Sequence, residues 1–232
     1  VMAVAIFGFS LVDGGGDDVA ASAVLTMSTS EDISGYARAI EARDWQFPRD
    51  HGAHNDYQIE WWYYTGNYQT EDGRRFGVQF TIFRRALSPT NPDSESEWRT
   101  NQAYMAHFSV SDLDAGEFYH EERYSRGAAG LAGALPDEVE PDAPFRVWLE
   151  DWESRALNDD ASQMRITADA GNFAVDLTLE RVKPIALQGD NGLSPKSEDE
   201  GNASYYYTLS RLLTEGTITL DGETFNVSGT TW

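Results

Sequence analysis

Two side chains could donate a proton inside apolar surroundings. Glu60 directly precedes Trp61 and Trp62, and His107 lies within the apolar stretch Ala103–Val110. A general acid at neutral pH requires a histidine, or a carboxylic acid whose pKa is raised by burial. We therefore name Glu60 and His107 as candidate catalytic residues. The competing roles are a salt bridge to an arginine for Glu60 and a structural, hydrogen-bonded core position for His107.

A larger set of aromatic and cationic residues could hold a ligand. Aromatic faces bind apolar molecules and stabilise a cation by about 0.5 to 2 kcal/mol each, and cations can orient water or a polar end group. The alternative roles are strand packing for the aromatic residues and pairing with acids for the arginines. The candidate ligand-binding residues are Trp61, Trp62, Tyr64, Arg84, Lys196, Tyr206, Arg211 and Trp232.

Other catalytic and metal-binding motifs are incomplete or absent in the sequence. His51 and His54, with Glu60 following, suggest a metal site, but Gly52 lies between them and a strand follows. The segment therefore lacks the helix face on which two histidines bind zinc. The chain also has no Gly-x-Ser-x-Gly nucleophile elbow and no phosphate-binding loop. We predict that the protein uses neither a metal nor a cofactor.

The candidate residues lie on segments with the patterns of β-strands. Ile59–Tyr68 is rich in aromatic and β-branched residues, and Arg75–Arg84 places apolar residues at every second position. Because successive side chains of a strand point to opposite faces, the four consecutive aromatics from Trp61 to Tyr64 place two on each face. Whichever face is buried is therefore aromatic.

The rest of the chain continues this pattern. We predict a short helix at most near Ser34–Ala42, loops at Ser88–Arg99 and Lys183–Glu200, and about nine or ten short strands. This pattern predicts an all-β, antiparallel barrel or sandwich, and a closed barrel of roughly eight strands can hold one small ligand. Besides the two strands above, those predicted are Ala103–Val110, one beginning at 117, Phe145–Trp152, Met164–Ala168, Phe173–Val182, Ala203–Leu213, Gly216–Leu220 and Thr224–Trp232.

Composition limits the classes of partner. The chain has 39 acidic and 17 basic residues, a net charge of −22, so it lacks the basic surface that a nucleic-acid-binding protein needs. Cysteine is absent, which excludes disulfides, thiolate nucleophiles and cysteine-ligated zinc. Apolar content of 41% is enough for a packed core.

The N-terminal region differs from the remainder. Residues 1–23 begin with a dozen apolar residues, too few to span a bilayer, and resemble a truncated signal peptide or an anchor. Residues 24–44 are predicted to be a polar linker, and residues 45–232 a single β-domain. A secreted, periplasmic or cell-envelope location follows from the signal-like segment.

Several motifs together resemble the AttH/CrtC family of lipocalin-like proteins, which includes carotenoid 1,2-hydratases. The resemblance begins at His54–Arg84 and extends, in order, over the region from about Phe47 to the end. The later motifs that agree are Ala106–Asp112, Gly130–Ala134, Lys183–Lys196, Ser204–Arg211 and Val227–Trp232.

The resemblance implies a lipocalin-like barrel that binds a hydrophobic small molecule such as a lipid or polyene. It also implies a second lipocalin-like domain in cis, so we expect this chain to correspond to the first domain. Two functions remain open: ligand binding, and cofactor-independent addition of water to a terminal C=C bond. A third is a structural role beside an export system of the ABC transporter type.

Overall fold

The structure, a computed structural model, describes residues 33–198 and 200–232. The predicted signal-like segment 1–23 and the first part of the linker, 24–32, lie outside the described residues. Within the described part, the single helix is a short 3-10 turn, η1 (Arg49–His51), and no helix forms near Ser34–Ala42. No helix in this part is both long and apolar enough to cross a membrane.

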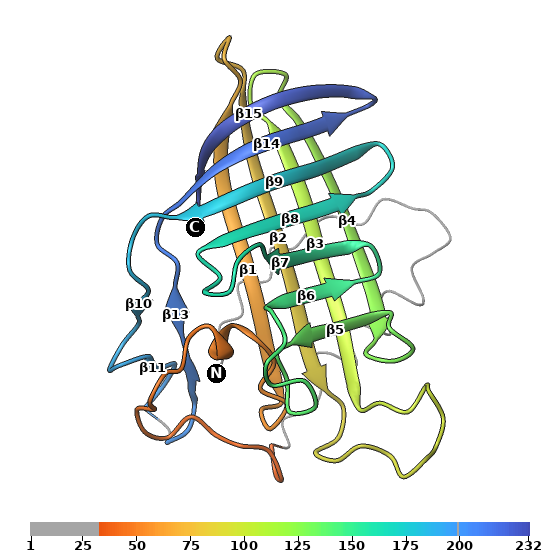
Figure 1. Ribbon diagram of the computed structural model, residues 1–232, viewed down its shortest axis with the longest axis vertical. Coiled ribbons are helices and arrows are strands. Elements are labelled where there is room, and N and C mark those ends of the chain that lie inside the picture. The colour runs from red at the N-terminus through yellow and green to blue at the C-terminus, as the bar shows by residue number, and fades with distance from the viewer. Residues whose placement is uncertain (1–32, 199) are drawn as a thin grey trace.

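Eleven strands form one antiparallel sheet, in the order β4-β3-β2-β1-β15-β14-β9-β8-β7-β6-β5. Near one end of that order, β6 contacts β2, β3 and β4 from the other end, so the sheet curls nearly into a barrel. Figure 1 shows β1–β4 crossing behind the layer of β5–β9 and β14. The strands are β1 (Ile59–Gln69), β2 (Arg75–Ala86), β3 (Gln102–Asp112), β4 (Glu117–Arg126), β5 (Ala132–Leu135), β6 (Arg146–Leu149), β7 (Trp152–Ala156), β8 (Gln163–Asp169), β9 (Phe173–Arg181), β14 (Leu212–Leu220) and β15 (Glu223–Thr231).

The all-β, lipocalin-like prediction is confirmed, but nine or ten strands was too few. One predicted strand, Phe145–Trp152, is in fact a hairpin of β6 and β7. Glu150 turns the chain there with a φ of 56°. The segment is rich in aromatic and apolar residues, as a single strand would be, and it contains no glycine or proline to indicate the turn. The Gly/Ala-rich segment 127–135, which is not among the predicted strands, also contains a strand, β5.

Two pairs of short strands lie outside the main sheet. β10 (Ala186–Leu187) pairs with β13 (Tyr207–Thr208), and β11 (Leu193–Pro195) pairs with β12 (Ala203–Tyr205). The predicted loop Lys183–Glu200 and the predicted single strand Ala203–Leu213 are therefore both wrong in part. The hydrogen bonds of residues 203–208 go to the returning loop, and pairing with the main sheet begins only at Leu212.

Alternate side chains of the strands fill the interior of the barrel. Phe108 stacks on Phe173 at 4.7 Å between ring centroids and meets Trp152 edge-on at 5.5 Å. Phe80 packs against Phe108 from the neighbouring strand. Fully burying a side chain of this kind contributes about 1.5–3 kcal/mol to folding. The middle of the barrel is therefore a packed core, which places any ligand elsewhere.

β1 has two parts that differ in their pairing. Over Thr65–Gln69, the closed half, it pairs with β2 on one side and β15 on the other, and Thr65 and Trp232 exchange backbone hydrogen bonds of 2.8 Å. Over Ile59–Tyr64, the open half, it pairs with β2 alone among the described residues. The closed half requires Gly229, where a Cβ would lie 2.0 Å from the Asn67 carbonyl oxygen. The two halves place similar aromatic residues in different environments.

Candidate functional site

A pocket of about 230 Å³ lies beside the open half of β1. Its wall is formed by four parts of the chain: the segment before β1, β1 itself, the segment from β12 to the start of β14, and Trp232 after β15. Four of the seven tryptophans belong to it. The lining residues are Ala39, Arg43, Trp45, His54, Tyr57, Ile59, Glu60, Trp61, Trp62, Tyr63, Tyr64, Ala203, Ser204, Tyr205, Tyr206, Tyr207, Thr208, Leu209, Leu212 and Trp232.

Both faces of the open half reach this pocket. Trp62 and Tyr64 point inward and are buried, whereas Trp61 and Tyr63 on the outer face are 39% and 42% exposed. Trp232 lies edge-on to Tyr63, with ring centroids 6.4 Å apart. A strand with a neighbour on each side would separate its two faces. The missing neighbour allows one pocket to use both.

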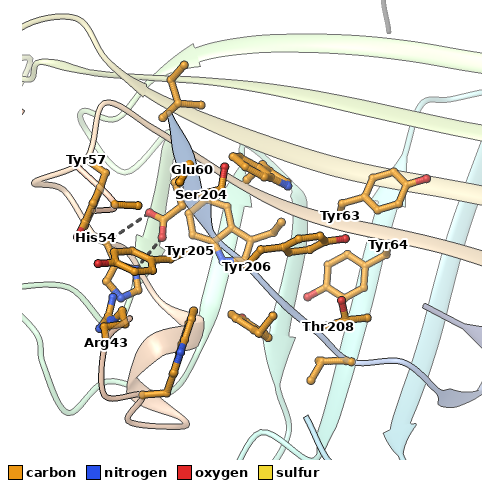
Figure 2. A pocket seen from close by; sticks show the side chains of 18 of the residues that line it. Arg43, His54, Tyr57, Glu60, Tyr63, Tyr64, Ser204, Tyr205, Tyr206 and Thr208 are labelled. Atoms are coloured by element: carbon orange, nitrogen blue, oxygen red, sulfur yellow. Dashed lines mark hydrogen bonds and ion pairs between the residues drawn. The ribbon is translucent and has the colours of Figure 1, made fainter. Parts of the chain in front are cut away.

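An alternating row of charges forms one end of the site. Arg43 contacts Asp50 at 2.8 Å, and Asp50 contacts His54 Nε2 at 3.2 Å. His54 Nδ1 lies 2.7 Å from one oxygen of Glu60, and Arg84 Nε donates to the other at 3.2 Å. Figure 2 shows His54 and Glu60 together at one side of the pocket, with Tyr63 and Tyr64 at the other. Each charge in the row has an opposite charge as its neighbour.

These contacts set the protonation states. Burial disfavours a charged His54, but its hydrogen bonds to Asp50 and Glu60 outweigh burial and raise the pKa of His54 to about 9. For Glu60, burial alone would raise the pKa, yet His54 and Arg84 hold it below its ordinary value. The pKa of Asp50 is lowered in the same way, against burial, by His54, the Gln46 backbone N–H and Arg43. At neutral pH the pocket therefore presents an imidazolium beside a carboxylate.

Arg84 positions this row from behind the wall. Its side chain is fully buried and does not line the pocket. Besides Glu60, it donates to the carbonyls of His54 and Tyr57 at 2.9 Å each and to the Gln102 side chain at 2.7 Å. A buried guanidinium with this many partners fixes Glu60 together with the segment that precedes it.

The other end of the pocket is uncharged. Ser154 donates a hydrogen bond of 2.9 Å to the Tyr64 hydroxyl, which itself approaches the sulfur of Met164 at 3.9 Å. Burial raises the pKa of Tyr64 to about 12, so this hydroxyl stays protonated. Thr208 lies next to it (Figure 2). The pocket thus runs from an ion pair, along aromatic walls, to neutral hydroxyl groups.

The structure brings most of the predicted site residues together. Arg84 only supports the wall. Neither Lys196 nor Arg211 lines the pocket, and both side chains are exposed. Lys196 instead lies over the ring of Tyr206, 5.5 Å from its centroid. The predicted residues that do line it are Glu60, Trp61, Trp62, Tyr64, Tyr206 and Trp232.

His107 is neither in the pocket nor in the core. It lies on the outer face of β3, with its side chain 37% exposed. There it contacts the Phe83 ring at 5.6 Å between centroids and Glu122 at 3.5 Å. Its apolar sequence neighbours point to the opposite face of the strand, which is why the sequence misled. The structure therefore separates His107 from Glu60.

Sequence reasoning missed several pocket residues. His54 was noted only for a metal site, and the structure separates it from His51, which bonds to Tyr207 instead. Residues 33–44, predicted as a linker, contribute Ala39 and Arg43 to the pocket. The six-residue spacing from His54 to Glu60 was a usable signal, because a tight turn before a strand can bring such a pair together.

Comparison with known proteins identifies the family and supports the fold. The model of the AttH-like family matches residues 38–232. The chain belongs to the AttH-like family. No curated protein matches it. A solved structure from Nitrosomonas europaea, assigned as an AttH, shares 33% identity with this AttH-like chain, with a TM-score of 0.67. That match covers 84% of this chain and 56% of the other.

A second solved structure shares the fold. Kievitone hydratase from Nectria haematococca is 14% identical, with a TM-score of 0.55, over 85% of this chain and 56% of its own. The AttH-like chain therefore spans about 56% of the length of either structure. At this identity the likeness to the hydratase establishes the fold and leaves the chemistry to the residues of the site.

Proposed function

We propose that this AttH-like chain binds the end group of an apolar, unsaturated small molecule in the aromatic pocket beside β1. The observation that carries the proposal is that both faces of one aromatic strand segment line a single pocket. Ligand sites are typically apolar cavities with a few placed polar groups. Here the polar groups are the His54–Glu60 pair and the hydroxyl of Tyr64.

The size of the pocket narrows the ligand. A cavity of about 150 Å³ accepts a benzene ring, so 230 Å³ suits one ring or a short branched chain. A long lipid or polyene would place only its end here, with the remainder outside. Trp61 and Trp232, both at least 39% exposed, would cover the part of the ligand nearest the entrance.

A titration tests this proposal. Geraniol, a short unsaturated isoprenoid alcohol, is titrated into the protein by calorimetry. We expect saturable binding that Trp61→Ala weakens about tenfold, since an aromatic contact contributes on the order of 1–2 kcal/mol. Trp98→Ala, an exposed tryptophan of the loop after β2, is the matched control and should bind as the unaltered protein does. Equal weakening by both variants would overturn the proposal.

A second candidate function is addition of water to a C=C bond, which the protonated His54 favours. The His54 Nε2–H proton, leaving its 3.2 Å contact with Asp50, would pass to one alkene carbon as the π bond breaks, leaving a cation on the other. Aromatic faces would stabilise that cation. Water would then form the new C–O bond, and its proton would return to His54. Because Glu60 is ionised, its role here is to hold His54 in place and to stabilise its protonated form, and not to donate the proton itself.

Mass spectrometry after incubation with geraniol tests this second function. A product one water heavier, formed by the unaltered protein and lost in His54→Gln, is the expected result. Recovery of unchanged geraniol from a protein that binds it would sink the hydratase candidate and leave the binding proposal standing. A location outside the cytoplasm, an export partner and a second lipocalin-like domain in cis stay predictions.

A further inference from the structure

His51 is a buried polar residue for which neither proposed function has a use. It is 1% exposed and packs against the rings of Phe47, Phe145 and Tyr207. Its carbonyl accepts a hydrogen bond of 2.8 Å from Trp62, so the backbone is tied to the pocket wall. Burying a histidine in such apolar surroundings costs desolvation free energy that an apolar residue would not cost. The presence of His51 there therefore suggests a role for its ring nitrogens.

The ring of His51 has a single hydrogen-bond partner among the described residues. Nδ1 lies 2.8 Å from the hydroxyl oxygen of Tyr207, whereas Nε2 is buried without a partner in that part of the chain. Burial and the charge of Arg181 lower the pKa of His51 to about 4, so the ring is neutral and carries one N–H. The proton is on either Nδ1 or Nε2.

The two arrangements differ in what they leave unsatisfied. With the proton on Nε2, a buried N–H has no acceptor. With the proton on Nδ1, that N–H donates to Tyr207, and only a ring lone pair is left over. Buried N–H groups without an acceptor are rarer than buried acceptors without a donor. The Nδ1–H form is therefore favoured, and in it the Tyr207 hydroxyl accepts from His51 and keeps its own proton to donate.

Tyr207, the partner of His51, belongs both to the pocket wall and to a short strand pair. It is held in β13, paired to Leu187 of β10. Burial raises the pKa of Tyr207 well above its ordinary value, and the charges of Glu60 and Asp50 and the Tyr64 hydroxyl raise it further. The hydroxyl stays protonated, and no acceptor for its proton occurs among the residues that the structure describes.

We propose that Tyr207, oriented by His51, donates a hydrogen bond to an acceptor oxygen of the ligand. This rests on the proposed binding function and narrows it: the ligand is an apolar, unsaturated or ring-containing molecule that carries a carbonyl, ether or hydroxyl oxygen. Tyr207 is the binding residue, and His51 is a positioning residue that acts through it. Glu60 is ionised and can only accept hydrogen bonds, so it cannot donate one to this ligand oxygen.

Nitrogen NMR of the histidine rings tests the orientation without any ligand. Protein labelled with ¹⁵N in histidine should show His51 as a neutral ring with its proton on Nδ1, assigned by loss of the signal in His51→Phe. A neutral ring with its proton on Nε2 would overturn the inference, since Tyr207 would then give its proton to His51.

Paired probes test the ligand chemistry. Acetophenone has an acceptor oxygen, and ethylbenzene has nearly the same shape without one. We expect the protein to prefer acetophenone by roughly threefold to tenfold, the effect of one net hydrogen bond. Tyr207→Phe should abolish this preference while leaving ethylbenzene binding unchanged, and His51→Phe should reduce it. Tyr124→Phe, whose hydroxyl bonds to Glu122 on the surface, is the matched control.

The outcomes separate the two proposals. If both probes bind and the preference survives Tyr207→Phe, the assignment of Tyr207 fails and the aromatic pocket stands. If neither probe binds to the unaltered protein, the proposed function fails and the assignment fails with it.

Discussion

The two halves of β1 have similar side chains and opposite uses. In the closed half, the Tyr68 hydroxyl lies 2.6 Å from Thr231 Oγ1, which lies 2.7 Å from Thr214 Oγ1, so three strands are linked inside the barrel. In the open half, Trp62 and Tyr64 occupy the corresponding inward positions but line a pocket. The residue types do not decide between packing and binding. The presence of a second neighbouring strand does.

The comparison also explains the polar groups. In the closed half, hydroxyl groups of neighbouring strands satisfy one another, and no charge is needed. In the open half, η1 and the loop before β1 supply the partners, and they supply charged ones: Asp50 and His54. A ligand site requires polar or charged groups that can also interact with the ligand. Here the segment before β1 supplies them.

The largest effect should come from the anchor of the open half. Arg84→Ala leaves Glu60 buried without its guanidinium and should lower the free energy of unfolding by about 3–5 kcal/mol, measured by urea denaturation. Arg75→Ala removes an exposed pair with Asp114 and is the control, with a much smaller loss because solvent screens exposed pairs. Equal losses would mean that the buried row is not what holds the open half.

The next largest effect is a pH dependence of the free energy of unfolding that originates in the open half. His54 has a pKa of about 9 when folded and 6.5 when unfolded, so its stabilising effect is complete below pH 6.5. The effect is lost as pH rises to 9, because only the folded state still binds the proton. Relative to His54→Gln, we expect an advantage in unfolding free energy of up to about 3 kcal/mol at pH 6 that disappears near pH 9.5. A pH-independent difference would contradict the charged row.

Side chains on the two faces of the open half should separate binding from stability. Trp61→Ala should weaken geraniol binding about tenfold with a clearly smaller loss of unfolding free energy than Trp62→Ala, because Trp61 is partly exposed. Trp62→Ala should weaken binding and also cost about 3 kcal/mol of stability, because Trp62 is buried. A loss of stability for Trp61→Ala as large as for Trp62→Ala would show that the outer face is structural.

The smallest effect is expected from the closed half. Thr231→Val removes the hydroxyl between Tyr68 and Thr214 and should cost about 1–2 kcal/mol of unfolding free energy. Geraniol affinity should not change, since neither Thr231 nor Tyr68 lines the pocket. Calorimetry on the same variant checks this, and a weakened affinity would mean that the two halves are not independent.

The fold was largely predictable because alternating strands with turn signals encode it locally. The site was predictable only in part. Glu60 and the aromatic residues of β1 were found because they lie on one strand. His54 reaches the pocket through the loop before β1, and Tyr207 through a short strand pair that no local pattern encodes. His107 misled because alternation alone does not say which face of a strand is buried.

The central claim is that ligands bind at the open half and not in the packed barrel. Incorporating fluorinated tryptophan gives seven ¹⁹F signals, which single substitutions assign. On adding geraniol, the account predicts shifts for Trp45, Trp61, Trp62 and Trp232, with Trp98, Trp148 and Trp152 unchanged. A shift at Trp152, in the core, with none at Trp61 would place the ligand inside the barrel and contradict the account.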